Sequence, residues 1–174
     1  MASLKFTAAL ELPRPKAQAQ ETKALQKKAE SAITKGVLRG GKYVQQDLRA
    51  ALDLALESPT WSWPRDTLRV NGSTAGTSRD IIDTGKLKSS LKFTEKNAQT
   101  KTGITIAYTA PYAAMVHYGG AVQPYGNPRA ATVIIPGRPW VTAVMTGTHG
   151  FEKFDANEAY RRGIFEVWNE AFPA

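Results

Sequence analysis

The chain has 174 residues, of which 42% are hydrophobic, enough to build one domain with its own core. It contains no cysteine, which excludes disulfides, thiolate nucleophiles and thiolate metal ligands. It also lacks the run of about 18 apolar residues that a membrane span needs and the basic-then-apolar start of a secretory signal, so we expect a soluble protein made in the cytoplasm.

The positive charge is concentrated near the N-terminus. Net charge is +8, and residues 1–50 carry +6 of it. Such a region can be a solvated helix face, a docking surface for an acidic protein partner, or a contact with DNA. Lys27 and Lys28 are the residues that we select as candidates for the partner contact.

The first 57 residues predict an extended arm followed by a long helix. Two prolines in Leu12–Pro15 disfavour a helix, so residues 1–15 are expected to be an arm or an edge strand. Residues 16–57 show apolar side chains at helical spacing, which predicts an amphipathic helix with a stripe of Leu25, Ala29, Ile33, Val37, Val44, Leu48, Leu52 and Ala55. Gly36, Gly40 and Gly41 interrupt this helix and predict a bend or break near Gly40.

Residues 58–79 are rich in Pro, Gly, Ser and Thr, which predicts a long irregular loop. This segment contains Trp61 and Trp63. They either anchor the loop to the core or form a contact surface for a neighbouring molecule, because tryptophan is enriched at interfaces.

The remaining residues predict short strands and helices. Residues 91–94 and 103–109 are expected to form an antiparallel hairpin, with the polar run 95–102 as its connection. A short helix is expected over 112–118, stopped by Gly119-Gly120, and a loop over 120–131. A third strand is predicted over 132–135, a helix start near Trp140, and a C-terminal amphipathic helix over 151–172.

Together these elements predict one α+β domain over residues 1–174. A small antiparallel sheet of about three to four strands, within residues 80–145, is expected to pack against the long N-terminal helix and the C-terminal helix. The N-terminal arm and the long loops are expected to protrude.

No pattern of catalytic or metal-binding residues is recognisable. His117 and His149 lack the spacing of a metal site, and the chain has no G-x-S-x-G elbow, Walker loop or G-x-G-x-x-G fingerprint. A pair such as Asp80 with Asp83 is more typical of a loop salt bridge or a helix cap. We therefore predict no enzyme, no cofactor and no metal, and a hydrolase with an unrecognised site is the weakest alternative.

Three short motifs follow one another along the chain. They are DTGKLKSSL at 83–91, APYAAMVHYG at 110–119 and IPGRPW at 135–140. Each combines turn residues with large apolar side chains, which indicates an architectural role rather than chemistry.

In this order, and with the lead-in Arg79–Ile82, the motifs resemble the neck or tail-completion proteins of long-tailed bacteriophages. The resemblance covers about residues 60–145. It implies a structural virion protein that forms a homo-oligomeric ring between the head connector or adaptor and the tail tube or terminator, with the genome passing through it and no sequence-specific DNA binding or membrane contact. It would be made in the host cytoplasm and located in the virion. On this interpretation the candidate interface residues are Trp61, Trp63, Tyr112, Tyr118, Arg138 and Trp140.

Two other interpretations of the chain stay open beside this one. The first is a tail-terminator ring protein. The second is a basic nucleic-acid-binding module, favoured by the charge of the N-terminal region but without the interleaved basic and aromatic residues of a single-strand platform.

Overall fold

A computed structural model describes residues 16–69, 72–82, 84–98, 101–123 and 131–173. It confirms the predicted α+β class: two long helices, α1 (Lys16–Glu57) and α5 (Ala156–Ala171), accompany short antiparallel strands. No helix among the described residues is both long and apolar enough to cross a membrane. The predicted N-terminal arm, residues 1–15, lies outside the described residues.

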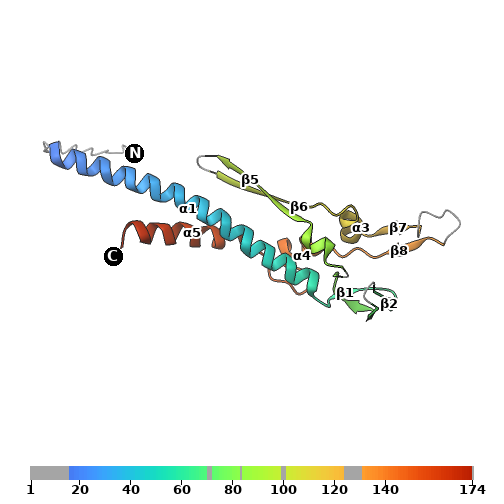
Figure 1. The fold of residues 1–174 in the computed structure, drawn as a ribbon. Helices are drawn as coiled ribbons and strands as arrows, with labels where there is room; N and C mark the ends of the chain where they lie inside the picture. The colour runs from blue at the N-terminus through green and yellow to red at the C-terminus, as the bar shows by residue number, and fades with distance from the viewer. Residues whose placement is uncertain (1–15, 70–71, 83, 99–100, 124–130, 174) are drawn as a thin grey trace, which may run out of the picture.

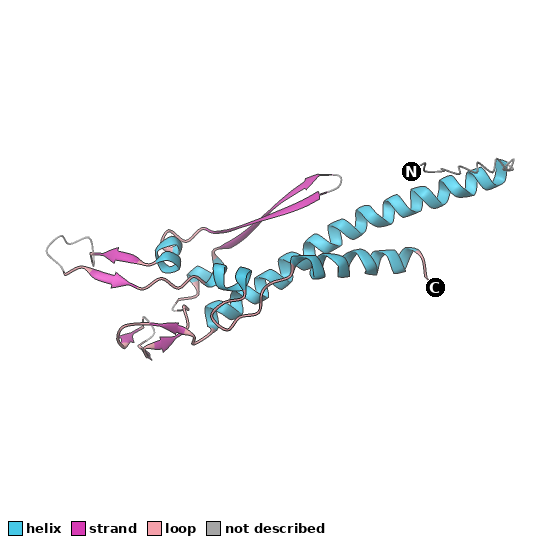
Figure 2. Cartoon of the chain, turned by 180° about the vertical axis from the view of Figure 1, so that it is seen from behind, coloured by secondary structure: helices cyan, strands magenta, loops and turns pink. Residues whose placement is uncertain are grey.

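The molecule is elongated along α1 (Figure 1). With 42 residues, α1 is about 63 Å long, whereas a compact domain of this chain length has a radius of gyration of only about 16 Å. Helix α5 lies beside α1, the β5–β6 hairpin lies along the C-terminal half of α1, and the other strands lie beyond its C-terminal end (Figures 1 and 2).

The predicted break near Gly40 is wrong, because α1 is continuous through this region. The glycines serve the packing of α5 instead. A Cβ atom on Gly40 would lie 2.7 Å from the Tyr160 carbonyl oxygen, and one on Gly36 would lie 2.9 Å from the Ile164 Cα. The two helices therefore approach so closely that only glycine fits, and this packing offsets the cost of about 1 kcal/mol that each glycine adds within a helix.

Ion pairs and hydrogen bonds along the same helix pair fix its antiparallel orientation. Arg162 pairs with Asp47 at 2.8 Å, while Arg39 pairs with Glu170 at 2.5 Å, nearer the start of α1. The Tyr43 hydroxyl donates to Glu166 at 2.6 Å, which raises the pKa of that phenol. These groups are largely exposed, so they set register more than they add stability.

Helix α5 begins five residues later than the predicted start at Phe151. The Asp155 carboxylate caps it by accepting hydrogen bonds from the backbone N–H groups of Asn157, at 2.8 Å, and Glu158, at 3.3 Å. This N-cap satisfies backbone donors that have no partner within the helix and so decides where the helix starts.

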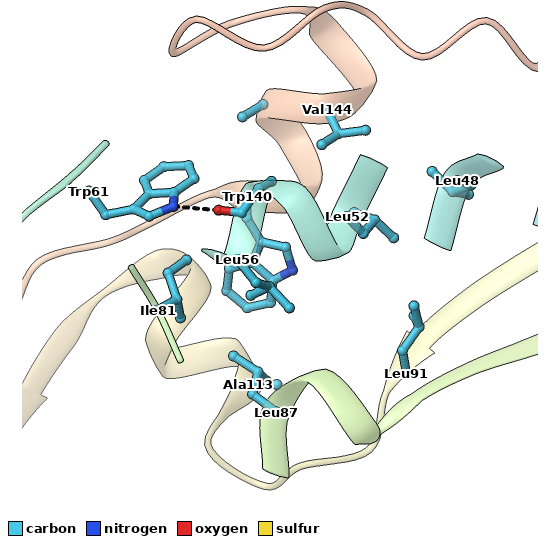
Figure 3. Close-up of a cluster of buried hydrophobic side chains, with 12 residues drawn as sticks. Leu48, Leu52, Leu56, Trp61, Ile81, Leu87, Leu91, Ala113, Trp140 and Val144 are labelled. Carbon is cyan, nitrogen blue, oxygen red and sulfur yellow. Dashed lines mark hydrogen bonds between the residues drawn. The ribbon is translucent and has the colours of Figure 1, made fainter. Parts of the chain in front are cut away.

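The main core lies at the C-terminal end of α1 (Figure 3). Leu52 and Leu56 are fully buried there against Trp140 and Val144 of α4 (Trp140–Thr146). The other buried members are Leu48, Ala55, Trp61, Ile81, Leu87, Leu91, Ala113 and Ala143. Trp61 is anchored by a 2.7 Å hydrogen bond from its Nε1 to the Ala55 carbonyl, drawn in Figure 3.

The predicted stripe of α1 is only partly buried. Val44, Leu48, Leu52 and Ala55 face the core as expected. Leu25 and Ile33 do not, because they remain 57% and 50% exposed. The stripe is continuous in sequence, but the elements that cover it end before its N-terminal part.

The described strands form four separate two-stranded antiparallel sheets, not one sheet of three to four strands. The largest is the hairpin of β5 (Leu91–Ala98) and β6 (Lys101–Tyr108). Both strands extend into the run 95–102 that was predicted as a connection, β5 to Ala98 and β6 from Lys101. An alternation of apolar and polar residues marks a strand only where one face is buried. The backbone hydrogen bonds of a strand do not require apolar side chains, so the polar residues of this run left no strand signal in the sequence.

The second hairpin joins β7 (Gly120–Val122) to β8 (Val133–Ile135). The prediction placed a loop over 120–131; β7 occupies its first residues, and 124–130 lie outside the described residues. The predicted strand over 132–135 corresponds to β8.

The predicted loop over 58–79 also contains strands. Here β1 (Trp61–Ser62) pairs with β4 (Ser78–Arg79), and β2 (Thr67–Leu68) pairs with β3 (Thr74–Ala75). Strands of two residues are too short to leave a periodic signal in the sequence.

Candidate interaction surfaces

The three sequence motifs, distant along the chain, meet in one place. The first contributes helix α2 (Lys86–Ser89), the second helix α3 (Ala113–Tyr118), and the third the segment that leads into α4. Leu87, Ala113 and Trp140, one residue from each motif, share the buried cluster drawn in Figure 3. The motifs are therefore parts of one structural unit.

Backbone contacts join the second and third motifs tightly. The Arg138 N–H donates to the Val116 carbonyl at 3.0 Å. Gly119 ends α3 with a φ of 77°, and a Cβ atom there would lie 2.6 Å from the Gly137 nitrogen. Both the left-handed backbone and the close approach require glycine at 119.

Two of the candidate interface tryptophans are internal. Trp61 is 3% exposed and Trp140 is 1% exposed. Trp140 makes edge-on ring contacts with Tyr108 at 5.3 Å and His117 at 4.8 Å. Both tryptophans hold the core of the protomer, so for them the interface assignment is wrong, and the anchor interpretation of Trp61 is confirmed.

His117 is also an internal side chain. Its Nε2 lies 3.3 Å from the Thr142 hydroxyl, and burial lowers the pKa of the imidazole. Burial likewise raises the pKa of the nearby Tyr108 phenol. Among the described residues no group of three His, Asp or Glu side chains is placed to hold a metal ion.

A cavity of about 450 Å³ opens where the motifs meet, and we call it the motif pocket. The first motif contributes Thr84 to Lys88, the second Tyr112 and Val116, and the third Arg138. Its other walls are Trp63, Thr67, Leu68, Arg69, Arg79, Asp80, Ile81 and Ile82.

Two buried arginines flank Trp63 in this pocket. The guanidinium carbon of Arg79 lies 5.1 Å from the indole centroid and that of Arg138 lies 4.8 Å from it. Trp63 is half-buried between them, and Arg138 is only 8% exposed, so Arg138 lies inside the pocket and not on the open surface. Cation–π contacts of this kind partly compensate the loss of hydration.

The two arginines differ in their hydrogen bonds. Arg79 donates to the carbonyls of Gly76, Arg65 and Ala75 at 2.7 to 3.0 Å, and so clamps the β2–β3 segment. Arg138 makes no side-chain hydrogen bond or ion pair within the described chain, and its Nε is buried without a partner. Burial, together with the charge of Arg79, lowers the pKa of Arg138 to about 10.

The remaining charges of the motif pocket are mostly paired. Arg69 binds Asp80 at 2.7 Å, which is the loop salt bridge that the sequence indicated for Asp80; Asp83 lies outside the described residues. Lys88 binds Glu57 at 2.6 Å and lies 3.5 Å from Asp53. Arg79 and Arg138 form no ion pair among the described residues, although Asp80 lies near enough to attract both, so positive charge exceeds negative charge in the described lining of the pocket.

The candidate tyrosines lie at the surface. Tyr118 is 80% exposed and Tyr112 is 40% exposed at the edge of the motif pocket. Both are accessible to a neighbouring molecule, as an interface role requires.

A second surface lies along the N-terminal half of α1. Leu25 precedes Ala32 by seven residues, two helical turns, so it lies on the face of α1 that Ala32 and Gly36 turn toward α5. Helix α5 ends well before the N-terminal end of α1 (Figure 2). We call Leu25 and Ile33, which are half or more exposed, the uncovered helix face.

Lys27 and Lys28 lie on α1 beside the end of α5. Both line a groove of about 610 Å³ between α1 and the end of α5. Lys28 Nζ lies 4.9 Å from the Phe172 ring, and every described side chain from 20 to 28 is exposed. The two candidate lysines are thus free to meet a partner.

The sequence did not predict that Arg79 and Arg138 both lie against Trp63. Arg79 stood only in the lead-in to the first motif, and nothing in its spacing connects it to Trp63 or to the third motif. The contact depends on the packing of three segments against one another.

Comparisons of the chain with protein-family models, curated proteins and solved structures found no match.

Proposed function

We propose that the protein is a structural component of a tailed bacteriophage, which forms a homo-oligomeric ring in the neck and joins the head connector to the tail. The observation that carries this proposal is the uncovered helix face. Leu25 continues the α5-facing side of α1 toward its N-terminus, Ile33 is exposed beside the part that α5 covers, and a second copy can cover both apolar side chains.

The isolated N-terminal part of α1 supports the same conclusion. Its described side chains from residue 20 to 28 are all exposed, and most helical stability in proteins comes from tertiary packing of an apolar face. A neighbouring subunit would supply this packing.

The unpaired strand edges are a second device for assembly. Each described strand pairs with only one other strand, so each hairpin has edges that no other described strand covers. Such edges add strands from a neighbouring chain, as in β-augmentation.

The three motifs resemble those of phage neck proteins, and this resemblance is the reason that we propose a phage neck ring rather than another homo-oligomer. In this role the motifs build the rigid unit around Trp140, and the helix pair and hairpins make the contacts between copies. The genome would pass through the ring without sequence-specific binding. A tail-terminator ring uses the same assembly logic and differs in its neighbours.

We expect the purified protein to form a closed oligomer, visible as one discrete mass by native mass spectrometry and as rings by electron microscopy. The double substitution Leu25→Glu/Ile33→Glu should weaken association at least tenfold, because it places two charges where apolar side chains would be buried between copies. Leu54→Glu, the same change at a position of α1 that is 63% exposed, is the matched control. A chain that remains monomeric at every concentration would contradict the proposal.

Charge reversal of Lys27 and Lys28 separates protein docking from DNA binding. We expect Lys27→Glu/Lys28→Glu to abolish incorporation into particles and leave the fold unchanged, because both lysines are exposed. DNA retention should change little, since two phosphate contacts alter the salt slope by only about two. Lys92→Glu/Lys153→Glu changes the net charge equally at two other exposed sites and should assemble normally. Normal assembly of the first variant with failure to retain DNA would favour the nucleic-acid-binding alternative.

A further inference from the structure

We infer that the motif pocket is a binding site for a carboxylate presented by an acidic segment of a protein partner, with Arg138 as the residue that receives it. This inference stands apart from the proposed ring, because it rests only on the pocket and its charges.

The first argument is the state of Arg138. Arg138 is only 8% exposed and lines the cavity. Its Nε has no acceptor among the described residues. A buried guanidinium without an acceptor loses hydration and gains no hydrogen bond in return. An incoming carboxylate would supply the missing acceptor and the missing negative charge.

The second argument is the charge around it. Arg79 donates its hydrogen bonds to neutral oxygens and forms no ion pair among the described residues, so it adds positive potential to the pocket. Lys86 lines the pocket without an ion-pair partner in the described structure, whereas Asp80, the described carboxylate in the wall, is already held by Arg69. The pocket therefore attracts one further anion.

The third argument selects the class of ligand. The walls include Leu68, Ile82 and Val116, so a ligand must bring apolar groups beside its negative charge. A volume of about 450 Å³ is within the range of small-ligand sites and suits one or two side chains of an extended peptide. The phosphates of duplex DNA lie on a convex polar backbone and are flanked by sugars, which do not match a concave, partly apolar pocket.

The test uses the full chain and a small peptide probe. Acetyl-leucyl-glutamyl amide carries one carboxylate beside one apolar side chain; acetyl-leucyl-glutaminyl amide is its neutral counterpart, and inorganic phosphate is the alternative anion. Binding is followed by NMR through the Nε–H signal of Arg138 and the indole signal of Trp63. We expect saturable shifts of both signals with the glutamyl peptide, at an affinity at least tenfold above that for the glutaminyl peptide or phosphate.

Two variants assign the site. Arg138→Gln should lower the affinity for the glutamyl peptide at least tenfold, and Arg161→Gln, at an exposed arginine of α5, should leave it unchanged. If Arg138→Gln does not fold, Lys86→Ala at the same pocket should still reduce the affinity measurably. Equal binding of both peptides, stronger binding of phosphate, absence of saturable shifts, or unchanged affinity in the pocket variants would each overturn the inference.

Discussion

We expect Trp140→Ala to lower the free energy of unfolding by about 3–5 kcal/mol, the usual cost of removing a large aromatic side chain from a core. Trp140 is 1% exposed and lies among Leu52, Leu56 and Val144 (Figure 3). Its removal leaves a cavity that the surrounding helices cannot fill without shifting, because α4 is held at both ends by the motif unit and α1.

The measurement is denaturant unfolding at a fixed protein concentration, since self-association would raise the apparent stability. Tyr118→Ala is the control, because this aromatic ring is 80% exposed and its loss should change the free energy of unfolding by less than about 1 kcal/mol. A loss below about 1 kcal/mol for Trp140→Ala would contradict the core assignment of this residue.

We expect Gly163→Ala to lower the free energy of unfolding by about 1–3 kcal/mol or more, as overpacking of a tight contact does. A Cβ atom at 163 would lie 2.6 Å from the Cα atom of Gly40 and 2.8 Å from the Arg39 carbonyl carbon. These are backbone atoms, so neither helix can relieve the clash by a side-chain rotation. The gain of about 1 kcal/mol that alanine brings to a helix interior is too small to offset it.

Thermal unfolding measures this effect, and the amide exchange of α5 should rise first, because α5 must move away from α1. Gly120→Ala is the matched control, since a Cβ atom at 120 meets no atom within 4 Å and should leave the melting temperature nearly unchanged. Increased stability of Gly163→Ala would mean that the two helices are further apart than described.

The glycines show why a pattern in sequence can be correctly noticed and wrongly interpreted. Gly36 and Gly40 stand out in a helical segment, and intrinsic propensity alone indicates a break there. The structure uses the missing side chains for a helix crossing, and the partner residue Gly163 lies more than 120 positions away. Propensity is local, whereas the packing partner that reverses its meaning is not.

The candidate interface residues fall into an exposed group and an internal group. The exposed residues Tyr112, Tyr118, Lys27 and Lys28 are accessible as the sequence analysis expected, but Trp61, Arg138 and Trp140 are internal. Large aromatic residues serve equally well in cores and interfaces, and no neighbouring residue in the sequence distinguishes the two roles.

By itself, the sequence determined the α+β class, the bounds of α1 at residues 16 and 57, the short helix ended by Gly119, and the segments that form the structural unit of the three motifs. These features follow from periodicity, helix stops and turn residues, which act over a few neighbouring positions. Only the tertiary structure decided that the strands form separate hairpins, that Leu25 and Ile33 remain uncovered, and that Arg79 and Arg138 enclose Trp63. Each of these depends on which distant segments pack together, and burial is a property of that packing rather than of any one segment.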